Sequence, residues 1–243
     1  MQILIIGATG RTGTLVLLEA LRRGHIVTAL VRKPSSLDNF LSTVPPTQKS
    51  NVTLVRGSPL DASDVVNAIT TASTANSQLA VISTLGTRRT SENPWAALHP
   101  TDSPPRMMAD SIANILSALT HTIVGKAGQS KVVHLSALGV GSSVSQAHWF
   151  TQTVLMHSNI KFTYEDHEAV EAELKGADKG IKWVIVRPGR LTEGDDGSEA
   201  KVWPAEKGRV GLMSKASRGA VARFLVNAAE RSEWDRKNPI VLS

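Results

Sequence analysis

The sequence predicts an α/β fold in which a doubly wound, parallel β-sheet carries helices on both faces. Short, uninterrupted apolar runs rich in Val, Ile and Leu recur along the chain. Such runs are typical of strands that are buried on both faces. Helical patterns separate these runs, and a glycine-rich loop directly follows the first of them. Strands that alternate with helices predict βαβ units and hence a parallel sheet.

The apolar runs and the periodic segments between them give the order of the expected elements. The expected strands are residues 2–6, 26–31, 52–55, 79–83, 131–135, 183–186 and 240–242. The expected helices are residues 14–23, a segment from 61 onward, 107–122, 163–175 and 218–231. The segment 139–162 carries no clear period and is left unassigned.

The chain reads as one domain over residues 1–243, because neither an internal repeat nor a linker divides it. Residues 190–217 are expected to form a small C-terminal cap over a substrate pocket. The segment 87–105 is rich in proline, has no clean period and is longer than most connections. A long loop of this kind is often a functional lid.

Composition excludes several functional classes. The net charge of +6 comes from scattered basic residues, which argues against a nucleic-acid footprint and suits a phosphate-bearing small molecule. The absence of cysteine excludes disulfides, Cys-zinc sites and thiol nucleophiles, and is compatible with a reducing compartment. The first apolar run ends at Gly7 and is too short for a signal peptide or a membrane span. We therefore expect a cytoplasmic protein with a small-molecule substrate and no membrane partner, and leave its oligomeric state open.

The loop from Gly7 to Gly13 has the spacing of a dinucleotide-binding turn. Gly7 permits a tight turn, Gly10 lets the backbone approach a pyrophosphate, and Gly13 lets the helix pack close to the sheet. The helix N-terminus then offers free N–H groups and a positive dipole to phosphates. We expect a Rossmann-type fold with cofactor contacts from Gly7, Thr9, Gly10, Arg11, Thr12 and Gly13. A tight turn without a ligand is the alternative.

The motif Gly-Ala-Thr-Gly-x-x-Gly at residues 7–13 resembles that of the atypical short-chain dehydrogenase/reductase superfamily, in particular its NmrA-like and biliverdin-IXβ (flavin) reductase group. Further stretches that are similar to this group are Leu30-Val31-Arg32, Leu85-Gly86-Thr87-Arg88, Ser136-Ala137, Asp166-His167, Arg187-Pro188-Gly189 and Met213-Ser214-Lys215. The resemblance implies an NAD(P)H-dependent reductase, with further cofactor contacts at Thr84, Leu85, Gly86, Ser136, Pro188 and Gly189. The segments 87–105 and 139–162 depart most from the group, which places substrate identity there.

The end of the second strand predicts NADP(H) rather than NAD(H). NAD-specific proteins carry an acidic residue here, which accepts the ribose hydroxyls. This chain instead has Arg32 and Lys33, and no carboxylate occurs before Asp38. Two cations can bind a 2′-phosphate that a carboxylate would repel. Alternatively, both are solvated residues at a strand end.

The sequence lacks the proton donor that is usual in short-chain reductases. Short-chain reductases commonly use a tyrosine that a lysine four residues later activates, but here Tyr164 is followed by Glu168. A carboxylate at that place would raise the pKa of the phenol. The resemblance puts His167 where that tyrosine falls, with Glu171 four residues on and on the same helix face. His167 is either a catalytic group or a core histidine beside Val170.

Ser136, just after a strand, is the second candidate catalytic residue, and an ordinary loop serine is the alternative. The remaining histidines lack metal-ligand spacing, so we expect no metal site, and no Gly-x-Ser-x-Gly elbow is present. The favoured function is an NADPH-dependent oxidoreductase that reduces a small conjugated substrate of the flavin, quinone or enone type. The alternatives are a non-catalytic NADP(H)-binding redox sensor or regulatory protein, and a non-redox isomerase or dehydratase.

Overall fold

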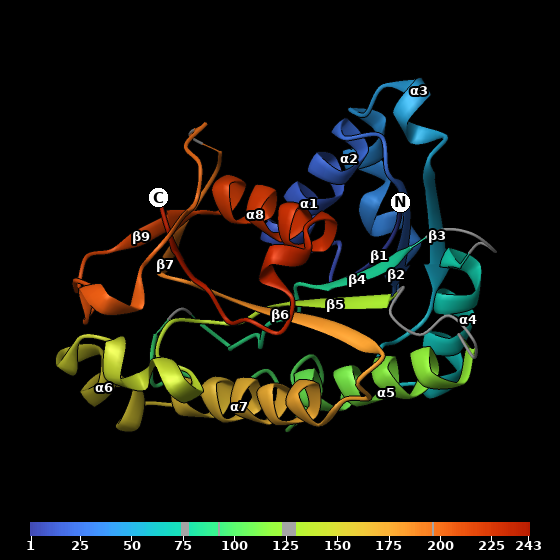
Figure 1. Ribbon diagram of the computed structural model, residues 1–243. Helices are drawn as coiled ribbons and strands as arrows, with labels where there is room; N and C mark the ends of the chain where they lie inside the picture. Colours follow the sequence, from blue (N-terminus) through green and yellow to red (C-terminus); the bar gives the residue numbers. More distant parts are fainter. Residues whose placement is uncertain (74–77, 92, 123–129, 196) are drawn as a thin grey trace.

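The computed structural model describes residues 1–73, 78–91, 93–122, 130–195 and 197–243. Within these ranges a central sheet lies between two layers of helices (Figure 1). The strands are β1 (Gln2–Ile6), β2 (Ile26–Val31), β3 (Val52–Arg56), β4 (Leu79–Ser83), β5 (Ser130–Leu135), β6 (Ile181–Pro188), β7 (Arg190–Thr192), β8 (Lys201–Val202), β9 (Lys215–Ser217) and β10 (Ile240–Leu242).

The strand order of the main sheet is β3-β2-β1-β4-β5-β6-β10-β8 among the described residues. Neighbouring strands from β3 to β10 run parallel, and β8 pairs antiparallel with β10. The chain therefore winds outward from β1 in one direction and from β4 in the other. In such sheets a ligand binds in the crevice at the carboxyl ends of the strands where the winding reverses. The predicted fold class is confirmed.

Helices cover both faces of this sheet. The α-helices are α1 (Arg11–Arg22), α2 (Asp38–Ser42), α3 (Pro46–Lys49), α4 (Ala62–Ala72), α5 (Met107–Thr122), α6 (Trp149–Met156), α7 (Ile160–Gly176) and α8 (Arg218–Glu230). Figure 1 shows α1 and α8 on one face and α4, α5 and α7 on the other.

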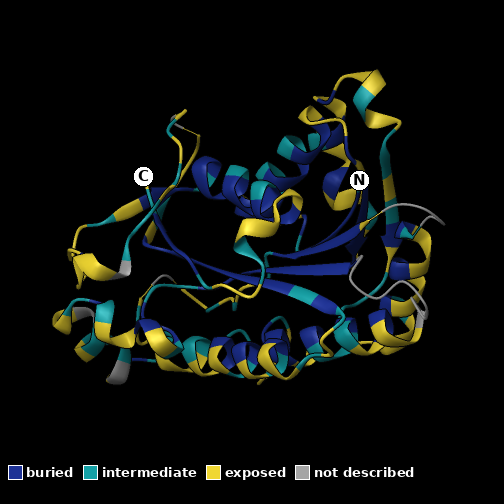
Figure 2. Cartoon of the chain, viewed as in Figure 1, coloured by how far each residue is buried: buried dark blue, intermediate teal, exposed yellow. Residues whose placement is uncertain are grey.

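Side chains of the central strands alternate between two separate apolar cores. Ile3 and Ile5 of β1 pack with residues of α1 and α8, whereas Leu4 and Ile6 pack with residues of α4 and α5. This alternation follows from the period of two in a strand, and it explains why every residue of β1 is buried (Figure 2). Two cores of aliphatic side chains thus hold the sheet rigidly beneath the site.

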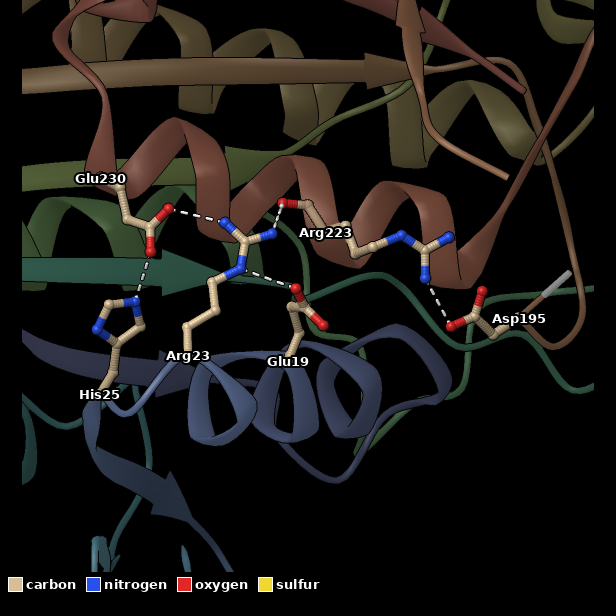
Figure 3. A network of polar contacts seen from close by, with 6 residues as sticks. All are labelled: Glu19, Arg23, His25, Asp195, Arg223 and Glu230. Carbon is tan, nitrogen blue, oxygen red and sulfur yellow. Dashed lines mark hydrogen bonds and ion pairs between the residues drawn. The ribbon is translucent and has the colours of Figure 1, made fainter. Parts of the chain in front are cut away.

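A network of charged groups ties α1 to α8 (Figure 3). The Arg23 guanidinium lies 2.8 Å from the Glu19 carboxylate and 2.7 Å from that of Glu230. The second Glu230 oxygen lies 2.7 Å from His25 Nε2. Further along α8, Arg223 lies 2.6 Å from Asp195. The network holds the end of α1, the end of α8 and the loop after β7 together.

Several element boundaries differ from those expected. The first helix begins at Arg11 rather than 14, because Gly10 has an extended backbone and is already the N-cap. The unassigned segment contains a 3₁₀ turn (Gly141–Gln146) and α6, and the following helix begins at Ile160 rather than 163. The short helices α2 and α3 were not expected, since their sequences have no apolar period.

Residues 190–217 do not form one separate layer. β7 and β9 form a small parallel sheet of their own, whereas β8 extends the main sheet. In the parts of the chain that the structure describes, no helix has the length and apolarity that a bilayer span needs.

Candidate active site

The glycine-rich loop has the geometry that its spacing predicts. Gly7 has a φ of +90°, a backbone conformation that residues with a side chain rarely adopt. A Cβ atom on Gly13 would lie 2.0 Å from the Gly7 carbonyl oxygen, so only glycine lets α1 approach the loop this closely. The Thr84 hydroxyl donates to this carbonyl at 3.2 Å and joins the loop to the end of β4.

The N-terminus of α1 suits an anion. Gly10 caps this helix without a side chain, and α1 has no acidic residue in its first turn. The first N–H groups of a helix have no partners within the helix, and the dipole there is positive. The loop and helix therefore fit the pyrophosphate of a dinucleotide.

A cavity of about 380 Å³ opens beside this loop. Its walls come from the glycine-rich loop, the ends of β2 and β4, the segment after β3 and the long loop before α5. The predicted cofactor residues that line it are Gly7, Thr9, Gly10, Arg32, Thr84, Leu85 and Gly86.

Three charged side chains meet at one end of the cavity. The Asp102 carboxylate accepts hydrogen bonds from Arg32 and from Arg88, each at 3.0 Å and through a different oxygen. The hydrogen bond from Arg32 contributes most to holding the Asp102 pKa below its ordinary value. Sequence reasoning missed Arg88 and Asp102 as site residues. Both stand in the irregular loop 87–105, whose path no periodicity predicts.

Other predicted cofactor residues lie outside this cavity. Arg11 is exposed and forms an ion pair with Glu193 at 2.6 Å. Thr12 is buried and accepts a hydrogen bond from Arg218 at 2.9 Å. Lys33 is exposed.

Ser136, Pro188 and Gly189 lie at the neighbouring ends of β5 and β6. The Ser136 N–H donates to the Val186 carbonyl, and Leu138 N–H donates to that of Pro188. The Ser136 hydroxyl is buried and has no hydrogen-bond partner among the described residues. Because buried hydroxyls are normally paired, an unpaired one at the carboxyl edge of the sheet suits a ligand contact.

His167 is buried on α7, facing β5. Its Nδ1 lies 3.0 Å from His134 Nε2. Burial lowers the pKa of His167 to about 4, and burial also lowers the pKa of His134. Both imidazoles are therefore neutral near pH 7. His167 can donate or accept one hydrogen bond, but as a neutral imidazole it does not carry the extra proton that an imidazolium would donate as a general acid.

The neighbours of His167 on α7 also have partners within the protein. The spacing of four residues on the helix would allow Glu171 to bind His167, but Glu171 has other partners. It forms a 2.6 Å ion pair with the buried Arg187 and a 2.7 Å ion pair with Lys175. Asp166 accepts the backbone N–H groups of Met108 and Ala109, both at 2.9 Å, and so caps the start of α5.

Tyr164 is not activated. Its hydroxyl donates to the Leu138 carbonyl at 3.0 Å, and burial raises the pKa of the phenol to about 12. Tyr164 is therefore a weak acid that is already engaged with the backbone.

The loop 87–105 extends from the cofactor cavity to α6 and α7. It folds back on itself through a bridge between Arg89 and Leu98. Its tip is fixed by a 2.9 Å hydrogen bond from the Trp95 indole to the His157 carbonyl, after α6. Near its start, the hydroxyls of Thr87 and Thr163 lie 2.5 Å apart. Asp102 is thus the cavity end of a loop that also contacts α7.

Comparison with known proteins agrees with this geometry. The model of the NAD(P)H-binding family matches residues 7–232, from the glycine-rich loop to just past α8. The chain belongs to this family. It is also 29% identical to the reductase pytE of Aspergillus terreus, over 97% of this chain and 95% of that protein.

Solved structures share the fold. ChuY, an anaerobilin reductase from Escherichia coli, superimposes with a TM-score of 0.70 at 18% identity, covering 99% of this chain and 96% of that one. The oxidoreductase ylbE from Lactococcus lactis also gives 0.70, at 16% identity, covering 99% and 90%. The family match confirms the expected NAD(P)H-binding domain, and the solved structures confirm the expected fold. Both pytE and ChuY are named as reductases.

Proposed function

We propose that the protein is an NADPH-dependent reductase of a small conjugated acceptor of the flavin, quinone or enone type. The glycine-rich loop and the N-terminus of α1 would hold the pyrophosphate, and Arg32 would bind the 2′-phosphate. When bound, the cofactor supplies a hydride. Pro188, Gly189 and the Ser136 hydroxyl would contact it beyond the cavity.

The acceptor class is inferred from Tyr164, whose hydroxyl is hydrogen-bonded and whose pKa is raised. A simple ketone develops an alkoxide and needs a donor in the transition state. Tyr164 is engaged with Leu138 and has a pKa of about 12, and His167 is neutral. A conjugated acceptor spreads the negative charge and can take its proton from water. The relatives pytE and ChuY are both named as reductases, which supports reduction as the type of reaction.

Within this proposal Ser136 and His167 orient the acceptor. The free Ser136 hydroxyl would donate a hydrogen bond to it, and His167 would assist protonation at most. Ser136→Ala and His167→Ala should each lower kcat/KM about tenfold, less than the 10²–10⁴ that loss of a general acid costs.

Cofactor preference is tested by titrating NADPH and NADH into the wild type and Arg32→Ala. One charged hydrogen bond of roughly 1.5–3 kcal/mol corresponds to about ten- to 150-fold tighter binding of NADPH, and a second one multiplies this factor. Arg32→Ala should lose most of that preference, while Arg106→Ala, an exposed arginine that does not line the cavity, should keep it. Equal affinities in the wild type would remove the basis for NADPH.

Acceptor class is tested by comparing a quinone with an unactivated ketone across pH. The wild type should reduce the quinone efficiently and the ketone poorly. Efficient ketone reduction that His167→Ala abolishes would make His167 the catalytic acid. Cofactor binding with no turnover of flavins, quinones or enones would favour a regulatory protein instead.

A further inference from the structure

The carboxylate of Asp102 lies where two arginines converge on the cofactor cavity. Its two oxygens accept from Arg32 and Arg88, each at 3.0 Å. The arginine side chains are 68% and 71% exposed, whereas that of Asp102 is 23% exposed. The guanidiniums are thus accessible from solvent, and an anion belonging to the protein already bridges them. A phosphate makes the same charge-assisted hydrogen bonds to guanidinium groups.

The backbone of the loop holds Asp102 in this place. The Asp102 N–H donates to His99 Nδ1 at 3.3 Å, and Ser103 N–H donates to the His99 carbonyl at 3.0 Å. The Ser103 hydroxyl in turn accepts the Arg88 N–H at 2.6 Å. These hydrogen bonds hold the backbone at Asp102 without a contribution from Arg32. Asp102 is therefore a built part of the cavity wall.

We propose that Asp102 is a specificity-determining residue that competes with the 2′-phosphate of NADPH for Arg32 and Arg88. This inference rests on the proposed function, because it takes the 2′-phosphate to bind at Arg32. NADPH must displace the carboxylate from the arginines, whereas NADH leaves their ion pairs intact. Asp102 thereby weakens NADPH binding selectively and moderates the preference over NADH. Binding of the 2′-phosphate also separates Asp102 from Arg32.

The experiment measures binding without turnover, using fragments that differ only in the 2′-phosphate. The full chain is titrated calorimetrically with 2′,5′-ADP and with 5′-AMP, as wild type and as Asp102→Asn. Asp102→Asn keeps the size of the side chain and removes its charge. It should bind 2′,5′-ADP about tenfold more tightly and 5′-AMP within twofold of the wild type. In the Arg32→Ala background the gain from Asp102→Asn should shrink.

Glu173→Gln is the matched control, since it also removes one negative charge, but Glu173 pairs with Arg106 and neither residue lines the cavity. It should change neither affinity by more than twofold. Unchanged binding of 2′,5′-ADP to Asp102→Asn would overturn the role of Asp102. Weaker binding of 5′-AMP to this variant would instead make Asp102 an acceptor for the ribose hydroxyls. A wild type that binds both fragments equally would overturn the NADPH proposal itself, so the two failures are distinguishable.

Discussion

The two ends of the site treat their polar groups in opposite ways. At the cofactor cavity Arg32 and Arg88 are exposed, and one carboxylate in a surface loop is their partner. Between α7 and the sheet, Arg187 forms a buried ion pair with Glu171, and His167 forms a buried contact with His134. Exposed charges can exchange one partner for a ligand, whereas buried pairs are costly to break. The cofactor end is therefore suited to binding, and the α7 end to a fixed shape with few available protons.

Gly13→Ala should have the largest effect on cofactor binding, because it changes the position of the backbone that would hold the phosphates. The added Cβ would meet the Gly7 carbonyl, so α1 must shift away from the loop. We expect at least about a hundredfold loss of NADPH affinity, measured by calorimetry, since the phosphate cradle depends on this approach. Gly176→Ala at the end of α7 is the control, since nothing lies within 4 Å of its added Cβ. Normal NADPH binding by Gly13→Ala would show that this loop is not the cradle.

Arg187→Gln should have the largest effect on stability at the other end. It leaves the buried Glu171 carboxylate without its closest cation, at a cost of about 3–5 kcal/mol in unfolding free energy. Arg106→Gln removes an arginine that is 54% exposed and should cost under about 1 kcal/mol. Urea denaturation measures both. Similar losses would remove the contrast between the two regions.

His167 makes the fold sensitive to acid. Its pKa is about 4 in the folded protein against 6.5 ordinarily, so the unfolded chain binds more protons between these values. Stability should therefore fall as pH drops from 6.5 toward 4, by about 3 kcal/mol, and this contribution levels off below that window. The dependence of the unfolding midpoint on pH should become shallower in His167→Gln, and His134, whose pKa burial also lowers, should account for part of what remains. The exposed His121→Gln is the control, and equal slopes in the wild type and His167→Gln would argue against a neutral His167.

Tyr164→Phe should have the smallest effect on turnover. Removing the hydroxyl leaves the Leu138 carbonyl without its donor, at about 1 kcal/mol in stability. Turnover of a quinone should stay within a few-fold of the wild type. A loss of 10² or more would show that the phenol is the acid after all.

The two regions also differ in how far the sequence predicts them. The glycine-rich loop and Arg32 are predictable, because their spacing and the strands before them encode their place locally. Asp102 is not, since it reaches Arg32 from a loop 70 positions further along the chain. The His134–His167 contact joins residues 33 positions apart. A helical period shows which residues share a face, but not which side chain on a neighbouring strand that face meets.

The contact between α1 and α8 has a consequence for synthesis of the chain. Arg23 and Glu230 are 207 positions apart, so α1 packs against a helix that is synthesised long after it. At about 5–20 residues per second, α1 waits on the order of 10–40 s for this partner. During that time its apolar face, which includes Val16 and Leu17, lacks its native cover. A nascent chain stopped before α8 should therefore be a substrate for chaperones.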